Sequence, residues 1–214
     1  MKRIIIYGAS GHGKVICDIL EKCKREIKGF IDDDSKKWGL SFFRYKILGG
    51  YDYLNDIDRD QYEIIIGIGD NNTRKSISGK ISKEEIKFSI VIHPSAQIAK
   101  NVIIEEGTVV MANAVINPDT RIGKHCILNT SSSVDHDCDL GDFVHISPGA
   151  CLGGNIKVGK CSWIGLGASI KNNVIIGENS IIGAGAVVIN DIPDNVIVVG
   201  NPAKILKTNN KNGY

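Results

Sequence analysis

The sequence lacks the features that mark several classes of protein. No apolar run approaches the roughly 20 residues that a membrane-spanning helix needs, and the chain enters a strand-like segment directly after Met1 instead of a cleavable signal. Its 26 basic and 24 acidic residues leave no surplus large enough for a nucleic-acid surface or an anionic membrane. We therefore expect a cytoplasmic protein without membrane insertion and without a nucleic-acid partner.

The six cysteines show neither a zinc-binding nor a disulfide pattern. They form no C-x-x-C pair and have no histidine spacing suited to zinc. Cys126 and Cys138 occupy the same slot of a sixfold repeat, two residues before its aliphatic position, where small residues are frequent. This placement predicts reduced thiols with a packing role, and no metal.

What the chain does have is a first part that alternates apolar runs with helix-compatible stretches. That order is expected of a parallel sheet covered by helices. The predicted strands are Arg3–Tyr7, Glu26–Ile31 and Tyr62–Ile68, and the predicted helices are Lys14–Lys24 and Thr73–Glu85. Together they indicate a small, doubly wound, Rossmann-like α/β domain.

After Phe88 a strict sixfold pattern replaces the helical one. An aliphatic residue stands at every sixth position from Ile92 to Val188 without interruption. Neither a helix, with about 3.6 residues per turn, nor an ordinary strand has this period, whereas short strands joined by tight turns can coil so that each aliphatic residue points to the axis. The pattern therefore predicts a solenoid of short parallel strands.

A second periodicity sets the shape of this solenoid. Glycines recur every eighteen residues, which predicts three hexads per coil and a triangular prism of five-odd coils. Glycine suits a corner where the backbone needs a positive φ or a close approach. The glycines are Gly123, Gly141, Gly159 and Gly177.

We place the change of architecture between Lys87 and Pro94, and assign residues 1–90 to the α/β domain, 91–208 to the β-helix and 209–214 to a tail.

Three loops of the α/β domain are candidates for binding a nucleotide. The turn Gly8–Gly13 lies between the first strand and the first helix, where backbone N–H groups can hold phosphate, but its G-x-x-G-x-G spacing differs from the dinucleotide G-x-G-x-x-G. Asp32-Asp33-Asp34 follows the second strand, where a carboxylate commonly meets a ribose or a uracil-like base. Gly67–Asn71 ends the third strand, at the sheet edge where ligands bind. A tight connection and a solvated loop are the alternatives for the first two.

The most polar interruption of the solenoid contains a histidine flanked by two carboxylates. His136 follows the inward Val134 by two residues and is expected to project outward near a turn. Transfer of an acyl group to an amine or hydroxyl needs a base, and imidazole has a suitable pKa. Either Asp135 or Asp137 can hold its other nitrogen, as in other pairs of a base and an orienting group. The alternative is an ordinary surface histidine.

Three further histidines are assigned by their register. His145 lies nine residues, or half a coil, beyond His136, so we expect it to point outward and to meet the site of a neighbouring chain if prisms associate side by side. His93 and His125 lack polar company in the sequence, and we expect them at the surface or at the joint between the two parts.

Taken together, these residues resemble one family, the bacterial nucleotide-sugar acetyltransferases of the hexapeptide-repeat class. Its members N-acetylate UDP-4-amino sugars of bacillosamine-type glycan pathways, and sialic-acid O-acetyltransferases are their relatives. The resemblance covers essentially the whole chain. Its specific parts are Tyr7–Gly13, Ile68–Asn71 with Arg74-Lys75, Leu128–Ser132, His136, His145 and Gly200–Lys204. It implies a left-handed parallel β-helix and a homotrimer with acetyl-CoA between adjacent prisms.

The resemblance also implies roles for individual residues. His136 is the implied general base, and Asp137 its partner at a position where the family often has glutamate, so Asp135 stays a rival. The residues implied at acetyl-CoA are His145, Gly154, Leu166 and Ala184. Those implied at the nucleotide sugar are Ser10, Gly11 and His12 for the diphosphate, Asp32 and Asp33 for uridine, and Asp70 and Asn71 for the sugar.

We accordingly expect an enzyme that transfers acetyl from acetyl-CoA directly to the C4 amine of a UDP-linked amino-deoxy sugar. No cysteine occupies a nucleophile slot, so no covalent intermediate is expected. Two alternatives stay open at this point. One is O-acetylation of sialic acid or another sugar, and the other is a non-catalytic scaffold that binds sugar nucleotides.

Overall fold

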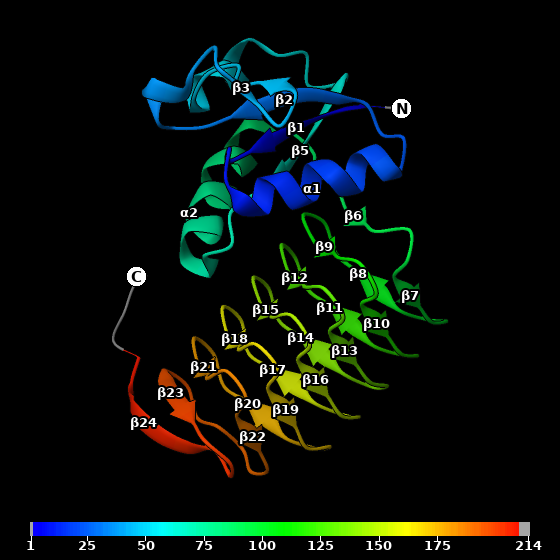
Figure 1. Ribbon diagram of the computed structural model, residues 1–214, viewed down its shortest axis with the longest axis vertical. Helices are drawn as coiled ribbons and strands as arrows, with labels where there is room; N and C mark the ends of the chain where they lie inside the picture. Colours follow the sequence, from blue (N-terminus) through cyan, green and yellow to red (C-terminus); the bar gives the residue numbers. More distant parts are fainter. Residues whose placement is uncertain (1, 210–214) are drawn as a thin grey trace.

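The computed structural model describes residues 2–209, so of the expected tail only Asn209 lies within the described residues. A small α/β part, residues up to Ser89, stands at one end of a long strand solenoid (Figure 1). The solenoid begins with β6 (Val91–Ile92) and runs to β22 (Val187–Val188). This architecture confirms the expected fold class, a Rossmann-like domain followed by a left-handed parallel β-helix.

The α/β part is built on a parallel sheet of three strands in the order β2-β1-β5. Its strands are β1 (Arg3–Tyr7), β2 (Ile27–Ile31) and β5 (Tyr62–Ile66), and its helices are α1 (Gly11–Lys22) and α2 (Asn71–Ile81). Successive side chains of a strand point to opposite faces. Ile4 and Ile6 therefore pack with α1, while Ile5 and Tyr7 pack in the cluster of α2.

Helix capping explains why both helices begin before their predicted first residues. Ser10 precedes α1 and its Oγ accepts a hydrogen bond from the Gly13 amide at 3.3 Å. Asp70 precedes α2 in the same way, and its Oδ1 accepts from the Thr73 amide at 2.7 Å. The caps start the helices three and two residues before the predicted Lys14 and Thr73.

Several short elements of the α/β part have no counterpart in the predicted set. Beyond Ile81 the chain tightens into the 3₁₀ turn η3 (Ser82–Glu84). The long connection between β2 and β5 carries η1 (Ser35–Lys37), the hairpin of β3 (Ser41–Phe42) with β4 (Tyr45–Lys46), and η2 (Tyr51–Asp56). No helix among residues 2–209 has the length and apolar character needed to cross a bilayer.

The solenoid consists of two-residue strands on three faces. Face 1 carries β7 (Gln97–Ile98), β10 (Val115–Ile116), β13 (Ser133–Val134), β16 (Cys151–Leu152), β19 (Ser169–Ile170) and β22. Face 2 carries β8 (Ile103–Ile104), β11 (Arg121–Ile122), β14 (Asp139–Leu140), β17 (Lys157–Val158) and β20 (Ile175–Ile176). Face 3 carries β6, β9 (Val109–Val110), β12 (Ile127–Leu128), β15 (His145–Ile146), β18 (Trp163–Ile164) and β21 (Ile181–Ile182).

Each predicted aliphatic position is the second residue of one of these strands. From Val110 onward these residues form a buried cluster along the axis, whereas Ile98 in the first coil is 37% exposed because no coil covers it. Cys126 and Cys138 lie in the same cluster, which confirms their packing role. Six strands on face 1 make about six coils, slightly more than the predicted number.

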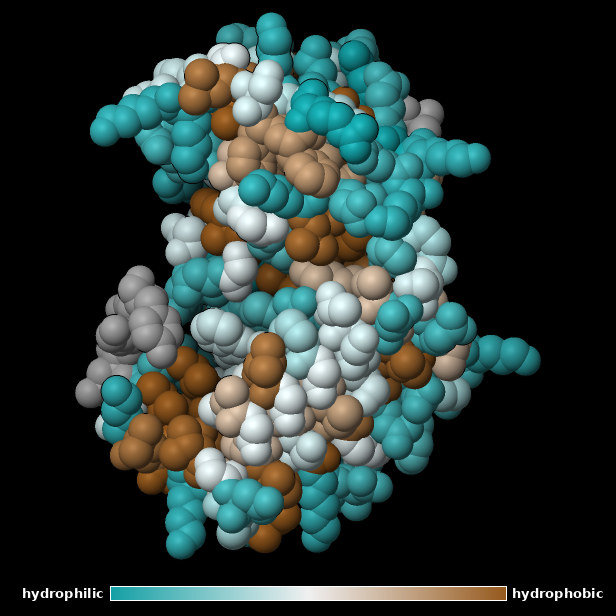
Figure 2. Space-filling model, in the orientation of Figure 1, coloured by the Kyte–Doolittle hydropathy of each residue, from teal (hydrophilic) through white to brown (hydrophobic). Residues whose placement is uncertain are grey.

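The chain ends its described part with two longer strands on face 3. β23 (Val196–Val199) continues the parallel stack, and β24 (Lys204–Thr208) pairs with it antiparallel. Apolar side chains gather over these two strands at the foot of the molecule in Figure 2, where Val199, Ile205 and Leu206 are exposed.

The glycine column serves close approach of the backbone and not a positive φ. A Cβ added at Gly141 lies 2.9 Å from the Lys160 amide nitrogen of the next coil. Left-handed backbone occurs instead in neighbouring slots, which asparagine and aspartate fill often because they tolerate it better than most residues. One such column contains Asn101, Asp119, Asp137, Asn155 and Asn173, with φ between 56° and 63°.

Replacing Gly159 by alanine tests the close-approach role of the column. The added Cβ lies 2.5 Å from the Glu178 amide nitrogen and 2.6 Å from the Gly177 carbonyl carbon. Both are backbone atoms, which cannot move aside as the end of a side chain can. We expect a loss of about 1–3 kcal/mol in the free energy of unfolding, measured by denaturant titration. Gly79→Ala in α2 is the matched control because its Cβ has open space. Equal stability of the two variants contradicts the interpretation.

Candidate active site

His136 lies on the turn between β13 and β14, at the corner where face 1 meets face 2. Its side chain is half exposed, and its Nδ1 lies 2.7 Å from Asp137 Oδ2. Asp137 belongs to the left-handed column, in which Asn101 bonds Asp119 and Asn155 bonds Asn173. Asp137 stands between these two pairs, so its carboxylate is free to bond the imidazole.

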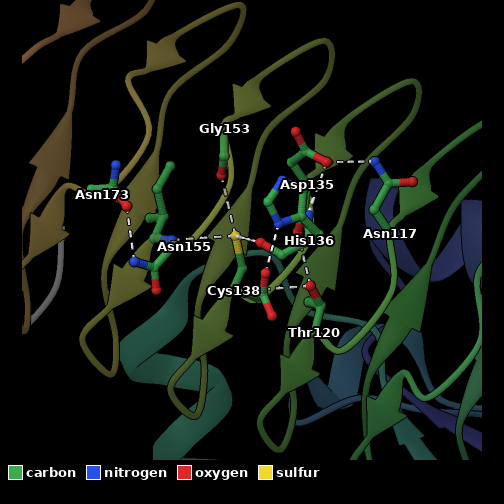
Figure 3. A network of polar contacts seen from close by, with 10 residues as sticks. Asn117, Thr120, Asp135, His136, Cys138, Gly153, Asn155 and Asn173 are labelled. Atoms are coloured by element: carbon green, nitrogen blue, oxygen red, sulfur yellow. Dashed lines mark hydrogen bonds and ion pairs between the residues drawn. The ribbon is translucent and has the colours of Figure 1, made fainter.

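The second carboxylate beside the histidine has a different role. Asp135 Oδ1 accepts hydrogen bonds from the His136 backbone amide at 2.9 Å and from Asn117 Nδ2 at 2.7 Å, and Figure 3 shows its side chain turned toward Asn117. Of the two rivals named from the sequence, only Asp137 contacts the ring. The hydrogen bond from Asn117 holds the pKa of Asp135 below its ordinary value, so it stays ionised.

The charge around the ring favours its protonated form. The hydrogen bond to Asp137, followed by the charge of Asp135, raises the pKa of His136 above its ordinary value. An imidazole that donates from Nδ1 to Asp137 leaves Nε2 as the atom that can accept a proton. The arrangement is that of a base with an orienting carboxylate.

Gly154 lies one coil after His136, directly against its ring. A Cβ added there lies 2.7 Å from His136 Cε1 and 2.8 Å from Nε2. Glycine at this position therefore leaves room for the imidazole. The sequence placed Gly154 at acetyl-CoA, and the structure adds this contact with His136.

His145 stands on face 3, in β15, and is only 8% exposed. Its ring stacks on that of Trp163 with centroids 5.3 Å apart, and its Nε2 lies 3.2 Å from Asn129 Nδ2. Burial, and then the positive charge of Arg74, lowers the pKa of His145 to about 3, so the ring is neutral at physiological pH. His145 points away from the prism axis as predicted, but the α/β part of its own chain covers it.

Two adjoining cavities meet at His145 and Trp163. One, of about 550 Å³, is lined by Gly69, Asp70, His145 and Trp163. The other, of about 390 Å³, extends along face 3 to Leu166 and Ala184. Three of the residues expected at acetyl-CoA thus share one wall. Trp163 was not predicted, although its place eighteen residues after His145 in the same outward slot could have revealed it.

The glycine-rich turn of the α/β part leads into His12, a half-buried histidine whose Nε2 atom lacks a hydrogen-bond partner. Ser10 Oγ donates to the Gly67 carbonyl at 2.6 Å, which ties the turn to the end of β5. Gly11 has open space around it, and the buried Nε2 of His12 has no hydrogen-bond partner. Burial, then the charges of Arg74 and His145, lowers the pKa of His12 to about 3. A buried polar atom of this kind calls for a ligand or water.

The two aspartates after β2 differ in their availability. Asp32 Oδ2 accepts from the Ala9 amide at 2.9 Å and Lys37 Nζ at 3.0 Å, while Oδ1 accepts from the Asp34 amide at 3.0 Å. Both oxygens of Asp32 thus take part in closing the loop, and its expected contact with uridine stays a prediction. Asp33 is exposed and only its Oδ1 is engaged, by the Tyr7 hydroxyl at 2.6 Å.

The pair expected at the sugar is likewise divided. Asp70 borders the larger cavity, where its Oδ1 caps α2. Asn71 is buried, and its Nδ2 donates to the carbonyls of Cys161 and Ser162 at 3.0 and 3.3 Å. The Asn71 amide therefore points into the solenoid, and its expected place at the sugar stays a prediction.

The remaining histidines have polar partners after all. His125 is buried at the joint, where its Nε2 lies 2.8 Å from Ser78 Oγ and its ring stacks on Phe143. His93 Nδ1 accepts from the Ser95 amide at 3.0 Å. The expectation of a joint position holds for His125. The expected lack of polar company is wrong for both, since Ser78 reaches His125 from α2, far away in the sequence, and Ser95 stands only two residues after His93. Among residues 2–209, no group of three or more His, Cys, Asp or Glu side chains is placed to hold a metal.

Within one chain, the candidate residues form two separate groups. His12, Asp70, His145, Leu166 and Ala184 lie around face 3, beside the α/β part. His136 and Gly154 lie at the corner of faces 1 and 2. A single chain therefore does not bring the two conspicuous histidines together.

Comparison with known proteins places this arrangement in a family. The profile of the PglD N-terminal domain matches residues 3–81. A UDP-N-acetylbacillosamine N-acetyltransferase of Bacillus subtilis (strain 168) is 37% identical over 119 residues, and the match spans 51% of this chain and 51% of that relative, about half its length.

Solved structures match over nearly the whole chain. The acetyltransferase domain of PglB from Neisseria gonorrhoeae FA1090 is 37% identical with a TM-score of 0.90, covering 96% of this chain and 100% of that one, and it is also known in complex with acetyl coenzyme A. A histidine-to-asparagine variant of perosamine N-acetyltransferase from Caulobacter crescentus, in complex with CoA and GDP-perosamine, is 34% identical with a TM-score of 0.91 and coverages of 96% and 97%. The chain belongs to the bacterial nucleotide-sugar acetyltransferases.

Proposed function

We propose that the protein transfers the acetyl group of acetyl-CoA to the C4 amine of a UDP-linked amino-deoxy sugar, with His136 as general base. The observation that carries the proposal is the 2.7 Å contact between His136 Nδ1 and Asp137 on an otherwise exposed corner. The relatives support the reaction class, since two of them are named as N-acetyltransferases of amino sugars.

In this reaction the sugar nitrogen attacks the thioester carbonyl carbon. A carbon–nitrogen bond forms, the carbon–sulfur bond breaks, and CoA leaves as its thiolate, which takes up a proton to become the thiol. His136 Nε2 takes the proton that the amine loses, and Asp137 keeps the opposite nitrogen protonated and the ring oriented. Gly154 leaves the imidazole the room it occupies.

The cavities along face 3 fit the thioester substrate. The wall with Leu166 and Ala184 is largely apolar, as a pantetheine arm requires, and its cavity of about 390 Å³ leads to His145. Neutral His145 can meet the acetyl group without placing a charge beside it. Since His136 lies on another corner, we propose that the active site forms between adjacent chains of a homotrimer, one providing His136 with Gly154 and the next providing the His145 wall.

The α/β part is proposed to hold the nucleotide sugar. The start of α1 offers the free backbone around Ser10 and Gly11, with the unpartnered His12 Nε2 beside it, for the diphosphate. Asp33 has an unengaged oxygen for the N–H of uracil, whereas Asp32 shapes the loop that presents it. Asp70, at the larger cavity, is the residue proposed to meet the sugar.

The acceptor is tested by thiol release from acetyl-CoA with a panel of sugars. We expect release with a UDP-linked 4-amino sugar and formation of an amide. A GDP-linked 4-amino sugar belongs in the panel because a relative binds GDP-perosamine, and its preference over the UDP sugar contradicts the uridine assignment. Release only with sialic acid or another hydroxyl acceptor contradicts N-acetylation, and release with none contradicts the catalytic proposal.

His136→Ala tests the base. We expect kcat to fall by about 10²–10⁴-fold, which is the usual contribution of a positioned general base. Calorimetric binding of the nucleotide sugar is expected to stay unchanged, because the α/β part holds it. Near-normal turnover by this variant excludes His136 as the base.

The pH dependence of kcat/KM tests the pairing with Asp137. Only unprotonated His136 accepts a proton, so activity falls as the pH drops through its pKa, and the raised pKa places this fall above the ordinary value of about 6.5. Asp137→Asn removes the largest cause of the raised pKa, so the acid limb moves to lower pH. Asparagine tolerates the left-handed backbone, as Asn155 does in the same column. An acid limb that does not move argues against the pairing.

A further inference from the structure

Arg74 is a fully buried guanidinium whose hydrogen bonds are complete. Its Nε donates to the His125 carbonyl at 2.8 Å, one Nη to the carbonyls of Ile68 and Gly69 at 3.1 and 2.9 Å, and the other Nη to Asn71 Oδ1 and the Phe143 carbonyl at 2.8 and 3.0 Å. A guanidinium has five N–H groups, and each one here has an uncharged oxygen acceptor.

The five acceptors come from both parts of the protein. The carbonyls of His125 and Phe143 belong to the same corner of two successive coils, where faces 2 and 3 meet. Asn71 extends the contact to a third coil through its bond to the Cys161 carbonyl. The carbonyls of Ile68 and Gly69 belong to the loop after β5. One side chain thus joins this loop to the wall of the solenoid.

The joined loop borders the same cavity as His145. Gly69 and Asp70 line the 550 Å³ cavity together with His145 and Trp163. The Gly69 carbonyl, which accepts from Arg74, is also near enough to influence the His145 imidazole. The position of the loop relative to His145 is therefore set through Arg74.

We infer that Arg74 is a positioning residue for acetyl transfer, which holds the Gly69–Asp70 loop at a fixed place beside His145. The inference rests on the proposed function, in which this loop meets the sugar and His145 meets the acetyl group. Misplacement of reacting groups by about 1 Å can cost about 10²-fold in rate, so fixing this distance matters for catalysis.

The choice of residue type supports a positioning role. Burial lowers the pKa of Arg74 to about 10, so it stays charged at neutral pH although no carboxylate bonds it directly. A buried charge is a costly way to join two surfaces, and apolar packing serves stability as well or better. What a planar guanidinium provides is a fixed geometry between five acceptors, which lysine cannot reproduce with three donors on one atom.

Ser78 offers a matched control on the same helix. It lies one turn after Arg74 in α2, is buried, and its Oγ contacts His125 Nε2 at 2.8 Å. Ser78→Ala therefore removes a buried contact between α2 and the same corner of the solenoid without touching the Gly69–Asp70 loop.

The experiment compares Arg74→Lys with Ser78→Ala by steady-state kinetics and thermal unfolding. We expect both variants to unfold at lower temperature than the parent protein. Arg74→Lys is expected to lower kcat at saturating substrates by about ten- to a hundredfold, with the KM for acetyl-CoA changed less than about twofold. Ser78→Ala is expected to keep kcat. Equal kcat for folded Arg74→Lys and the parent protein overturns the inference.

Two further measurements keep the outcome decidable. If Arg74→Lys does not fold, Asn71→Ala removes one of the five acceptors and leaves four, and a kcat unchanged from the parent protein overturns the inference.

If the parent protein acetylates no sugar, the proposed function fails separately. ¹⁵N relaxation of the Gly69 and Asp70 amides then decides, since we expect faster motion in Arg74→Lys than in Ser78→Ala. Equal motion in the two variants contradicts the positioning role.

Discussion

The return of the chain to the same corner every eighteen residues is the constraint on which the rest of the structure depends. Because each coil lies on the previous one, side chains in equivalent slots are neighbours whatever their type. This stacking places Gly154 against His136 and Trp163 against His145. It also aligns the corner carbonyls of His125 and Phe143, which then form one acceptor surface for Arg74. The positions of the functional groups therefore follow from the stacking of the coils, which the packing of aliphatic side chains along the axis produces.

The same protein holds histidines in opposite electrostatic states. His136 is exposed beside two carboxylates, which raise its pKa and prepare it to accept a proton. His145 is buried and His12 is half-buried, both near a guanidinium, and each has a pKa lowered to about 3. Burial is the larger cause for the latter two, and the charge of Arg74 is the next. The position of each ring relative to water therefore decides whether it serves as a base or as a neutral polar wall.

The sequence predicted most of the framework and part of the site. A strict period and a glycine spacing are one-dimensional properties, so the solenoid and the outward position of His136 followed from counting residues, whereas the left-handedness of the β-helix came from the family resemblance. Whether a polar atom already has a hydrogen-bond partner depends on the three-dimensional structure, so it could not be read from residue spacing. Asp32 lies in the motif expected at uridine, yet both of its oxygens are used by amides and a lysine from its own domain. Asn71 is adjacent to Asp70, yet the first turn of α2 points it into the solenoid.

The left-handed corner at Asp137 is a local turn whose geometry does not depend on which coil carries it. The same left-handed corner recurs in five successive coils and accepts asparagine or aspartate with nearly the same backbone, so nothing in the geometry of this turn ties it to one coil. The position of His136 along the solenoid axis is set by the number of whole coils between it and the α/β part. Insertion or deletion of eighteen residues above β13 shifts His136 by one strand spacing, about 4.8 Å, and preserves the turn. The distance between this turn and the α/β part therefore changes only in steps of one coil.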